Sequence, residues 1–526
     1  MAELSFVTET PQGPELVVPR DYNAAVDLIE RNLSAGRGAK TAYIDDAGSY
    51  SFGELASRVN RLANALRGLG LGMEDRIMVA LYDGIDFPSV FLGAIKAGIV
   101  PIATNTLLTT KDYEFMLRDS RAKVLVVSAG LLPVMAAAVA ASPFITMVVV
   151  AGEAPAGYLS LADLMAQAEP HFEPAPTTCD DACFWLYSSG STGTPKGTVH
   201  AHASLMQTAE LYGRRTLGLQ ASDTVFSAAK LFFAYGLGNA LTFPLAVGAT
   251  TVLMAERPTP EAVFKRLQTH QPTVFCGVPT LYAAMLAFQG KPAASTLGIR
   301  VCTSAGEALP ADVGRRFGEL YGVEILDGIG STEMLHIFLS NRPGDVRYGT
   351  TGKPVAGYQI RLIGDDGHEA LPGELGELQI CGPTSALLYW NNRQRTQDTF
   401  VGPWTRAGDK YSVDADGYYV YGGRSDDMLK VSGQYVSPFE VEGALASHPQ
   451  VLEAAVVGAE DEEGLIKPKA FVVLQADAVA DDALDADLKA HVKRQLAPHK
   501  YPRWIEFVPD LPKTATGKIQ RFKLRS

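Results

Sequence analysis

The run VLVVSAGLLPVMAAAVAASPFITMVVVAG, residues 124–152, decides how this chain folds, because it contains no charged residue. A charge-free run of that length can be a membrane-spanning helix. However, Pro133 and the Ser142-Pro143 pair interrupt it, and its composition changes from branched apolar residues to alanines and back. Two short branched runs around an alanine-rich run are typical of buried strands joined by a helix. The stretch therefore predicts a strand–helix–strand unit and argues against a membrane span.

The same alternation continues on both sides of this run. A helix is expected at Phe52–Leu69, where leucines share one stripe, and it is followed by strand, helix and strand at Ile77–Leu81, Phe87–Ala97 and Ile99–Ala103. The pattern returns between Thr224 and Ser304. Alternation of this kind predicts an α/β fold, a parallel sheet covered by helices on both faces, with ligands beyond the carboxyl ends of its strands.

The texture of the sequence changes from about Tyr348 onward. Short segments such as YQIRLI and GELQI are separated by DDG and PGE turns, which predicts a small antiparallel β unit. A final segment of roughly one hundred residues, an ordinary domain size, has its own pattern of helices and strands. The expected elements are helix 438–447, strands 451–457 and 470–474, helix 485–496 and strand 504–507. We therefore expect an N-terminal domain at 1–425 and a small α+β domain at 426–526, divided within GGRSDD.

The bulk composition describes an ordinary globular protein. The 526 residues carry a formal net charge of -12, with 47% hydrophobic and 20% charged residues. This net negative charge gives no sign of binding to nucleic acid or to an anionic membrane surface. The five cysteines are scattered without a CxxC pair, and the N-terminus lacks the basic start and apolar run of a signal peptide. We expect reduced thiols and a cytoplasmic location.

The stretch YSSGSTGTPKG, Tyr187–Gly197, is the densest glycine and hydroxyl cluster in the chain. It is not a P-loop, because Pro195 precedes Lys196 and Gly197 follows it, so the metal-binding hydroxyl is missing from its place. Its glycines still allow backbone amides and hydroxyls to turn toward phosphate oxygens, with Lys196 as a point charge. A flexible surface loop is the alternative interpretation. The stretch follows the candidate strand FWLY, which places it at a carboxyl end.

Further motifs follow this loop in order: SAGEALP (304–310), DGIGSTE (327–333), WTRAGD (404–409), YGGRSDDMLKVSGQYVSPFEVE (421–442) and PKTATGKIQR (512–521). Together with YSSGSTGTPKG they resemble the adenylate-forming superfamily of acyl-CoA synthetases, peptide-synthetase adenylation domains and firefly-type luciferases. The resemblance spans nearly the whole chain. It implies a large N-terminal domain, a small mobile C-terminal domain, and ATP, Mg²⁺ and coenzyme A as cofactor and co-substrates.

The resemblance also implies a role for individual residues in forming an acyl-adenylate. Lys518 would bridge the acid and the α-phosphate, Thr332 would bind the α-phosphate, and Glu333 would hold Mg²⁺. Asp409 would bind the ribose, and Arg424 would support ribose and phosphate. The other residues expected to bind ATP or AMP are Ser188, Ser189, Gly190, Ser191, Thr192, Gly193, Thr194 and Lys196 around the phosphates, and Ala305, Gly306, Glu307, Asp327, Gly328 and Ile329 around adenine.

Each of these residues has a plainer interpretation when it is taken alone. Glu333 is a residue type favoured near a helix N-terminus, and Thr332 is a common N-cap. Asp409 is of a type common in turns, and Lys518 of a type usually exposed. The plain interpretations do not explain why all of them occur together and in this order.

A second step, thioester formation, requires Lys518 to leave. The resemblance implies that the C-terminal domain rotates about a hinge at Asp426. The stretch containing Ser432 and Gly433 would then face the site and bind coenzyme A, since a glycine lets the pantetheine arm pass close to the backbone.

The acid pocket is expected around KLFFAYGLG (230–238), where Phe233 stands in place of a histidine found in other family members. Aromatic and small residues suit a small, flat acid, although ordinary core packing explains buried aromatics equally well. The run 328–358 resembles the benzoate–coenzyme A ligase family, which implies benzoate as the acid. The expected acid-binding residues are Phe233, Ala234, Tyr235, Gly236, Gly328, His336 and Ile337.

Several alternatives stay open at this level. Another aryl acid, such as a hydroxy- or aminobenzoate, can replace benzoate, and the acyl group can pass to a carrier protein rather than to coenzyme A. A luciferase-like oxygenase and an inactive acyl-nucleotide sensor are weaker interpretations. The expected partners are therefore small molecules, with no nucleic acid and no membrane, and a homodimer is left open.

Overall fold

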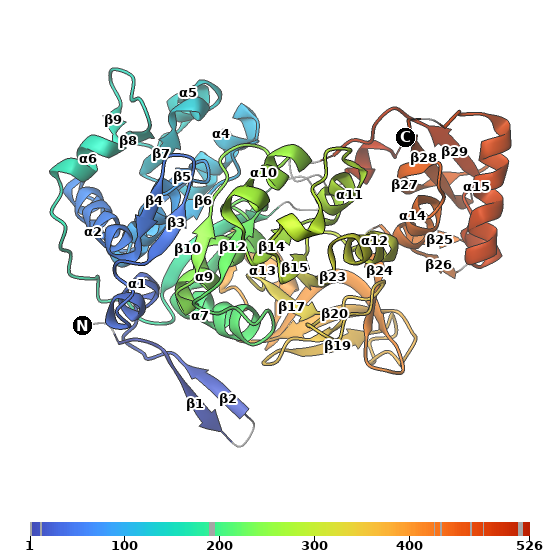
Figure 1. Ribbon diagram of the computed structural model, residues 1–526, viewed down its shortest axis with the longest axis horizontal. Coiled ribbons are helices and arrows are strands. Elements are labelled where there is room, and N and C mark those ends of the chain that lie inside the picture. The colour runs from blue at the N-terminus through green and yellow to red at the C-terminus, as the bar shows by residue number, and fades with distance from the viewer. Residues whose placement is uncertain are drawn as a thin grey trace.

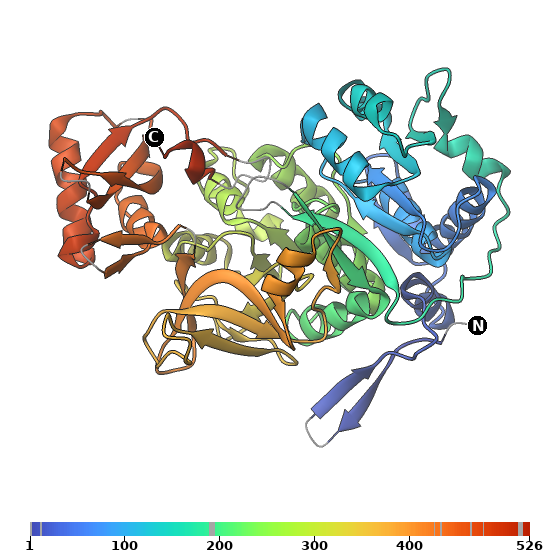
Figure 2. The same ribbon diagram turned by 180° about the vertical axis from the view of Figure 1, so that it is seen from behind.

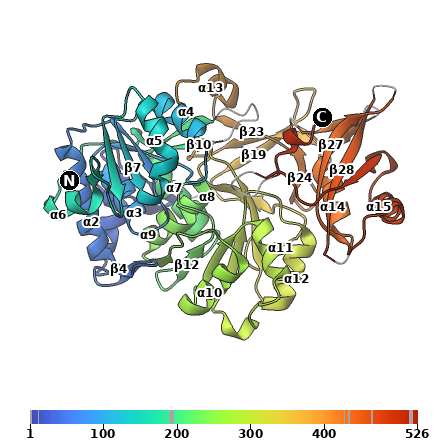
Figure 3. The same ribbon diagram turned by 90° about the horizontal axis from the view of Figure 1, so that it is seen from above.

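The computed structural model describes residues 3–10, 13–188, 195–425, 427–431, 434–462, 465–476, 478–513 and 519–525. Two large sheets with their helices form the bulk of the molecule, an antiparallel sheet lies beside them, and the C-terminal module stands at one end (Figure 1). Seen from above, this module lies at the end opposite the N-terminus (Figure 3). The predicted α/β class with an antiparallel unit and a C-terminal α+β module is confirmed.

The first sheet has the strand order β21-β11-β10-β6-β5-β7-β8-β9, and the strands from β10 through β6, β5, β7 and β8 to β9 run parallel. Its strands are β5 (Arg76–Ala80), β6 (Val100–Ala103), β7 (Val124–Ser128), β8 (Met147–Ala151), β9 (Leu159–Ser160), β10 (Ala182–Ser188), β11 (Lys196–Ala201) and β21 (Leu388–Tyr389). Its helices are α2 (Phe52–Gly68), α3 (Asp86–Lys96), α4 (Thr110–Ser120), α5 (Leu132–Ala141) and α6 (Leu161–Gln167).

Side chains of successive residues in the central strands point to opposite faces of this sheet. Ile77 and Val79 pack into the cluster that contains α2 and α3, whereas Met78 and Ala80 pack against residues of α4 and α5. Because side chains alternate along a strand, a strand covered on both faces must be apolar at every position, which explains the unbroken branched runs. The charge-free run is thus β7, α5 and β8. In the part of the chain that is described, no helix combines the length and apolar character needed to cross a bilayer.

The second sheet has the order β18-β17-β16-β15-β14-β12-β13-β3-β4. Its strands are β3 (Thr41–Ile44), β4 (Ser49–Ser51), β12 (Thr224–Ser227), β13 (Thr250–Val252), β14 (Val274–Gly277), β15 (Val301–Ser304), β16 (Ile325–Gly330), β17 (Ile337–Ser340) and β18 (Lys353–Pro354). The main helices of this part are α1 (Ala24–Ser34), α7 (His202–Thr208), α8 (Ala234–Leu237), α9 (Phe243–Val247), α10 (Pro260–His270), α11 (Pro279–Ala287) and α12 (Ala311–Tyr321). The alternation in the sequence therefore builds two sheets, and the early strand β3 joins the second.

The antiparallel sheet and the C-terminal module complete the chain. The sheet consists of β19 (Gln359–Ile363), β20 (Gly376–Cys381), β22 (Phe400–Val401), β23 (Trp404–Val413) and β24 (Tyr419–Arg424), with α13 (Arg393–Thr399) before β22. The module contains β25 (Leu429–Val431), β26 (Gln434–Val436), α14 (Pro438–Ala446), β27 (Val451–Glu460), β28 (Ile466–Leu474), α15 (Asp482–Gln495) and β29 (Trp504–Phe507). Its buried residues form their own hydrophobic cluster, as expected of a separate folding unit.

An N-terminal hairpin was not predicted. Strands β1 (Phe6–Thr10) and β2 (Gly13–Val17) pair only with each other among the described strands, and they project away from the body in both side views (Figures 1 and 2). Its base is fixed where Ser5 donates from its backbone N and its hydroxyl to the buried Asp27 carboxylate, which Arg31 also pairs at 2.6 Å.

Candidate active site

Two neighbouring parallel strands bring the segments expected around adenine together. Ser304 at the end of β15 pairs in register with Asp327 in β16, so the residues after Ser304 lie beside Asp327 at the same edge of the sheet. Ala305 is buried, and Gly306 has a φ of +94°, which favours glycine. The Glu307 carboxylate accepts a 2.8 Å hydrogen bond from the Thr280 hydroxyl. These contacts shape the backbone at the carboxyl ends, where ligands of such sheets bind.

The carboxyl group of Asp327 is buried. Burial raises its pKa to about 8, against a weaker opposing hydrogen bond from the backbone N of Leu309. One of its carboxyl oxygens, Oδ1, is buried with no partner among the described residues. The next residue, Gly328, leaves no room for a side chain, since a Cβ there would lie 2.9 Å from the carbonyl oxygen of Leu339. Asp327 therefore offers an unused polar atom at the strand edge.

Asp409 and Arg424 face each other across a strand pair. They are register partners on β23 and β24, and the Arg424 Nη1 lies 3.5 Å from the Asp409 Oδ1. Asp409 therefore lies inside a strand and not in a turn. Burial raises the pKa of the Tyr411 hydroxyl, and the negative charges of Asp409 and Asp327 add to that effect. Tyr411 thus lies near both carboxylates, which places the ribose and adenine candidates in one region.

Glu333 lies at the centre of a group of polar side chains from three parts of the chain. Its Oε1 accepts a 2.7 Å hydrogen bond from the Tyr389 hydroxyl and one of 3.4 Å from the Ser188 hydroxyl, and it lies 3.7 Å from the Lys196 Nζ. The Lys196 ammonium also donates to the Tyr389 oxygen at 3.2 Å and lies 4.4 Å from the centre of that ring. Residues 331–336 form the connection between β16 and β17, so the helix N-terminus interpretation of Glu333 is wrong.

The charges of this group favour an anionic ligand beside Lys196. Burial lowers the pKa of Lys196, the Glu333 carboxylate raises it, and the positive charges of Arg395 and Arg424 lower it again. Three cations are therefore within electrostatic range of one carboxylate. Part of the phosphate loop is described: Ser188 ends β10, and Lys196 begins β11 as its register partner.

The group can hold a hard divalent cation only together with a ligand. Among the residues that are described, no three His, Cys, Asp or Glu side chains gather as a metal site. Mg²⁺ commonly takes one or two carboxylates and completes its shell with phosphate oxygens and water. The single carboxylate of Glu333, with the hydroxyls of Tyr389 and Ser188 beside it, fits that requirement.

Thr332 is held through its backbone. Its carbonyl oxygen accepts a 2.7 Å hydrogen bond from the Nε2 of His200 in β11. The His200 ring stacks on Phe184 at 5.4 Å between ring centres, and burial lowers its pKa to about 4. The imidazole is therefore neutral at pH 7, and because a carbonyl only accepts, its proton lies on Nε2. His200 fixes the backbone between β16 and β17 without adding charge.

Two predicted acid-binding residues from distant segments, Tyr235 and His336, are in contact. The His336 Nε2 donates to the Tyr235 carbonyl oxygen at 3.2 Å, and the His336 ring lies 5.6 Å from the Tyr235 ring and 4.5 Å from that of Phe243. Burial lowers the pKa of His336 to about 3. The Tyr235 hydroxyl and the His336 Nδ1 are buried without a partner within the described ranges. The region therefore combines apolar rings with two unused polar atoms.

The residues next to Tyr235 in the sequence differ in how far they are buried. Phe232 is buried, whereas Phe233, Ala234 and Tyr235 are partly exposed at the start of α8. Ordinary core packing therefore accounts for Phe232 but not fully for Phe233. A Cβ at Gly236 would lie only 2.0 Å from the carbonyl oxygen of Lys230, so this wall depends on glycine. Ile337 begins β17 and is buried next to Gly328.

The remaining predicted residues lie outside the described part of the chain: Lys518, the hinge residue Asp426, the coenzyme A candidates Ser432 and Gly433, and Ser189, Gly190, Ser191, Thr192, Gly193 and Thr194 of the phosphate loop. Two residues that the motifs did not indicate, Tyr389 and His200, join the described site. Tyr389 lies in an ordinary-looking apolar run, and His200 follows the phosphate loop at a position where a strand was not assigned. Only contact in space identifies them.

A protein with these two domains and this site belongs to the AMP-binding enzymes. The model of the AMP-binding enzyme family matches residues 30–390, and that of the AMP-binding enzyme C-terminal domain matches residues 440–518. The chain therefore belongs to the AMP-binding enzyme family.

Individual relatives are similar along the full chain. A benzoate–CoA ligase of Thauera aromatica is 66% identical over 528 residues, covering 100% of both chains, and a 4-hydroxybenzoate–CoA/benzoate–CoA ligase of Rhodopseudomonas palustris is 53% identical over 96% of this chain and 94% of its own. Among solved structures, a benzoate CoA ligase from Burkholderia xenovorans LB400 has a TM-score of 0.91 at 55% identity, covering 96% of this chain and 100% of its own. An anthranilate CoA ligase in complex with anthranoyl-AMP has a TM-score of 0.93 at 44% identity, covering 96% and 97%.

Proposed function

We propose that this chain ligates benzoate to coenzyme A in an ATP-dependent reaction that passes through benzoyl-adenylate and releases pyrophosphate and AMP. The observation that carries this conclusion is the 66% identity to a benzoate–CoA ligase along the whole of both chains. The chain is accordingly an acid–thiol ligase of the AMP-forming type.

The first step joins two anions. A benzoate oxygen attacks the α-phosphorus of ATP, and the bond from that phosphorus to the β-phosphate oxygen breaks, so that pyrophosphate leaves. The carboxylate is already ionised at neutral pH and needs no general base. What the step needs is positive charge and alignment at the phosphate. We assign that charge to Lys196 on the β- and γ-phosphates and to Lys518 between the acid and the α-phosphate.

The described residues suggest how the nucleotide is oriented. Asp409, with Arg424 beside it at 3.5 Å, is assigned to the two ribose hydroxyls. The segments at Ala305–Glu307 and Asp327–Ile329 are assigned to adenine, and Thr332 to the α-phosphate. Glu333 is assigned to Mg²⁺, which would neutralise phosphate charge. The support is that these groups converge at the carboxyl ends of β15 and β16 and the end of β10.

The second step transfers the acyl group from AMP to the sulfur of coenzyme A. The thiolate sulfur of coenzyme A attacks the carbonyl carbon of benzoyl-adenylate, and the bond from that carbon to the AMP oxygen breaks. We propose that residues 426–526 rotate as a domain against residues 1–425, with the hinge at Asp426, so that Lys518 leaves and the stretch with Ser432 and Gly433 enters. The separate hydrophobic core of the C-terminal module is consistent with such a motion.

Benzoate is the acid that the site supports best. Phe233, Ala234, Tyr235 and Gly236 offer one wall, and His336, Ile337 and Gly328 another. Small apolar walls with few polar groups suit a flat acid. A hydroxy- or aminobenzoate is the second candidate, favoured by the Tyr235 hydroxyl and the His336 Nδ1, which have no hydrogen-bond partner among the described residues.

A screen of acids tests this proposal. AMP release is measured with ATP and coenzyme A across benzoate, hydroxybenzoates, aminobenzoates and short aliphatic acids, and the thioester product is identified by mass. Benzoate should give the highest kcat/KM, and AMP release should depend on coenzyme A. A short aliphatic acid that outperforms benzoate contradicts the aryl assignment. Benzoyl-adenylate that accumulates and is discharged only by a carrier protein contradicts the thioester assignment.

We also propose that the enzyme is cytoplasmic. All five cysteines are free thiols, as is usual in a reducing compartment.

We further propose that two copies associate through the N-terminal hairpin. An isolated two-stranded hairpin is marginally stable in water, and Phe6 on it is 56% exposed. Near its tip the hairpin contacts the body where the Arg215 Nη1 donates to the Pro14 carbonyl oxygen, and its strand edges can pair with those of a second copy. Deletion of residues 1–17 should lower the mass found by light scattering.

A further inference from the structure

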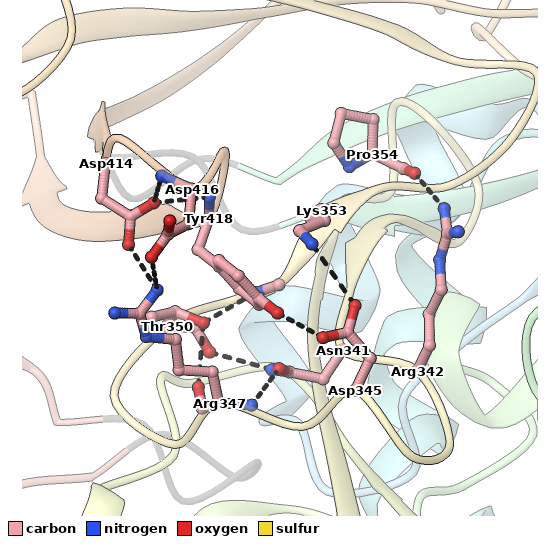
Figure 4. A network of polar contacts seen from close by, with 11 residues as sticks. Asn341, Arg342, Asp345, Arg347, Thr350, Lys353, Pro354, Asp414, Asp416 and Tyr418 are labelled. Atoms are coloured by element: carbon pink, nitrogen blue, oxygen red, sulfur yellow. Dashed lines mark hydrogen bonds and ion pairs between the residues drawn. The ribbon is translucent and has the colours of Figure 1, made fainter.

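A network of charged side chains joins a loop of the second sheet to the tip of the β23–β24 hairpin. The loop is taken as residues 341–354, the connection that follows β17 together with the short strand β18, and the tip is the turn at 414–418 (Figure 4). The Nη1 of Arg347 lies 3.0 Å from the Oδ2 of Asp414 and 3.0 Å from the Oδ2 of Asp416. Asp414 in turn closes the tip, because its Oδ1 accepts hydrogen bonds of 2.9 Å from the backbone N of Asp416 and of Tyr418.

The ring of Tyr418 adds a second connection. The guanidinium carbon of Arg347 lies 4.9 Å from the ring centre and the ammonium of Lys353 4.1 Å from it. The Tyr418 hydroxyl donates to Asp345, whose other oxygen lies 3.4 Å from the Lys353 Nζ (Figure 4). Cations over a ring face are held by its quadrupole. The hairpin tip is therefore contacted by two cations, Arg347 and Lys353, and one carboxylate, Asp345, from the loop.

One end of the loop is tied to the strand expected to hold adenine. The side-chain oxygen of the fully buried Asn341 accepts a 2.8 Å hydrogen bond from the backbone N of Arg347. The backbone N and the side-chain nitrogen of Asn341 both donate to the carbonyl oxygen of Asp327, at 2.9 Å and 3.2 Å. Arg347 is thus two hydrogen bonds away from Asp327.

The hairpin beyond the tip holds the residues expected to bind ribose. The backbone N of Thr351 donates to the Tyr419 carbonyl oxygen at 2.8 Å, and the Thr351 hydroxyl shares a 3.1 Å hydrogen bond with the Tyr411 hydroxyl. Tyr411 and Tyr419 lie on β23 and β24, the strands that pair Asp409 with Arg424. The loop is therefore bonded on one side to the adenine strand and on the other to the ribose hairpin.

We propose that Arg347 is a positioning residue for ATP: by clamping the tip at Asp414 and Asp416, it fixes the ribose hairpin relative to the adenine strand. The inference rests on the proposed roles of Asp327 and Asp409 in binding ATP. It assigns no role in the acid pocket, since the described contacts of Arg347 lead to Asp327 and to the hairpin and not to the segment at 230–238.

The physical argument concerns preorganisation. When the hairpin moves relative to β16, only a fraction of the molecules presents Asp409 and Asp327 at the spacing that one nucleotide requires. The apparent affinity for ATP then falls by that fraction. Benzoate binding and the chemical step in the bound complex do not change, because ATP itself reassembles the site once it is bound. Loss of the clamp should therefore appear in the KM for ATP.

Arg347→Ala tests this, with Arg342→Ala as the matched control. Arg342 lies in the same loop and donates to the carbonyl oxygen of Pro354 at 2.7 Å, so its contact stays within the loop. For Arg347→Ala, we expect the KM for ATP to rise roughly three- to tenfold, the size typical of exposed ion pairs coupled in a network. The kcat and the KM for benzoate should stay as in the wild type. AMP should also raise the unfolding temperature less than it does for the wild type. Arg342→Ala should match the wild type throughout.

Two further variants make the outcome decisive. Arg347→Lys, which keeps one charge, should recover part of the affinity. Asp416→Asn should raise the KM for ATP less, and combined with Arg347→Ala it should add little, since both break the same clamp. An unchanged KM for ATP in a folded Arg347→Ala enzyme overturns the inference, as does an equal rise in the KM for both substrates. An absence of ATP-dependent thioester formation in the wild type instead overturns the proposed function.

Discussion

At the scale of single residues, Tyr389 connects two charged groups of the candidate site. Its hydroxyl touches both members of an oppositely charged pair, Glu333 at 2.7 Å and Lys196 at 3.2 Å. A phenol can donate to the carboxylate and accept from the ammonium at the same time. It therefore lies between two charges that are 3.7 Å apart, and we propose that both of them act on the triphosphate of ATP.

Tyr389→Phe should lower kcat roughly tenfold, the size expected when a hydrogen bond to a charged group is lost. The loss should be found in benzoate-dependent exchange between pyrophosphate and ATP, because we propose that both charges act in that step. Thioester formation from supplied benzoyl-adenylate should be unaffected. Tyr113→Phe is the matched control, since that hydroxyl also donates a 2.8 Å hydrogen bond, but to the Asn105 backbone. An exchange rate equal to the wild type would refute the role of Tyr389.

At the scale of elements, strand register decides which residues meet. Asp409 and Arg424 are fifteen positions apart and face each other because β23 and β24 pair them. Ser304 and Asp327 meet because β15 and β16 are parallel neighbours. The proposed acid wall depends in the same way on the single turn of α8, in which Gly236 passes the carbonyl oxygen of Lys230.

Gly236→Ala should displace this turn, because its Cβ would lie 2.0 Å from the Lys230 carbonyl oxygen. The turn must open, and the wall formed by Phe233 and Tyr235 moves with it. We expect the KM for benzoate to rise at least roughly tenfold, in line with the 1–3 kcal/mol typical of overpacking, with little change in the KM for ATP. Gly68→Ala in α2 is the control, since nothing lies within 4 Å of its Cβ. Equal effects on both KM values would contradict the assignment of the wall.

At the scale of the whole molecule, the proposed rotation separates the two chemical steps. Lys518→Ala should abolish benzoyl-adenylate formation and spare thioester formation from supplied benzoyl-adenylate, because the lysine has withdrawn by then. Both half-reactions are measured on the same preparation, and Lys523→Ala serves as a nearby control. Equal losses in both steps would contradict the division of roles.

The stability of the whole molecule should depend on pH through buried histidines. Burial lowers the pKa of His200 and His202 from 6.5 to about 4. Between these values the unfolded chain binds more protons than the folded one, so the free energy of unfolding falls as the pH falls through that window. Chemical denaturation of the ligand-free enzyme at several pH values should give this slope. His202→Asn should reduce it, and the exposed His368→Asn should not. A His202→Asn variant with the same slope as the wild type would refute the argument.

The sequence predicted the local structure of the central strands well, for a physical reason. The run at 124–152 became β7, α5 and β8, because a strand covered on both faces must be apolar throughout. The division of the strands between two sheets was not predictable from alternation, since β3 follows the same pattern as β5 but pairs with β13. The hairpin at the N-terminus was missed because its strands bury little and carry no strong apolar pattern.

Local sequence order was enough to establish the α/β class, the C-terminal module and a set of candidate residues, since apolar periodicity and glycine-rich turns act over a few neighbouring positions. Three-dimensional packing established that Tyr389 joins Glu333 to Lys196, that His200 holds Thr332, and that Arg347 spans from the Asp327 strand to the hairpin of Asp409. The contacts of Tyr389 and His200 and the ion pair of Arg347 with Asp414 join residues between 56 and 193 positions apart. Such pairings depend on strand order and register, which no short window of the chain contains.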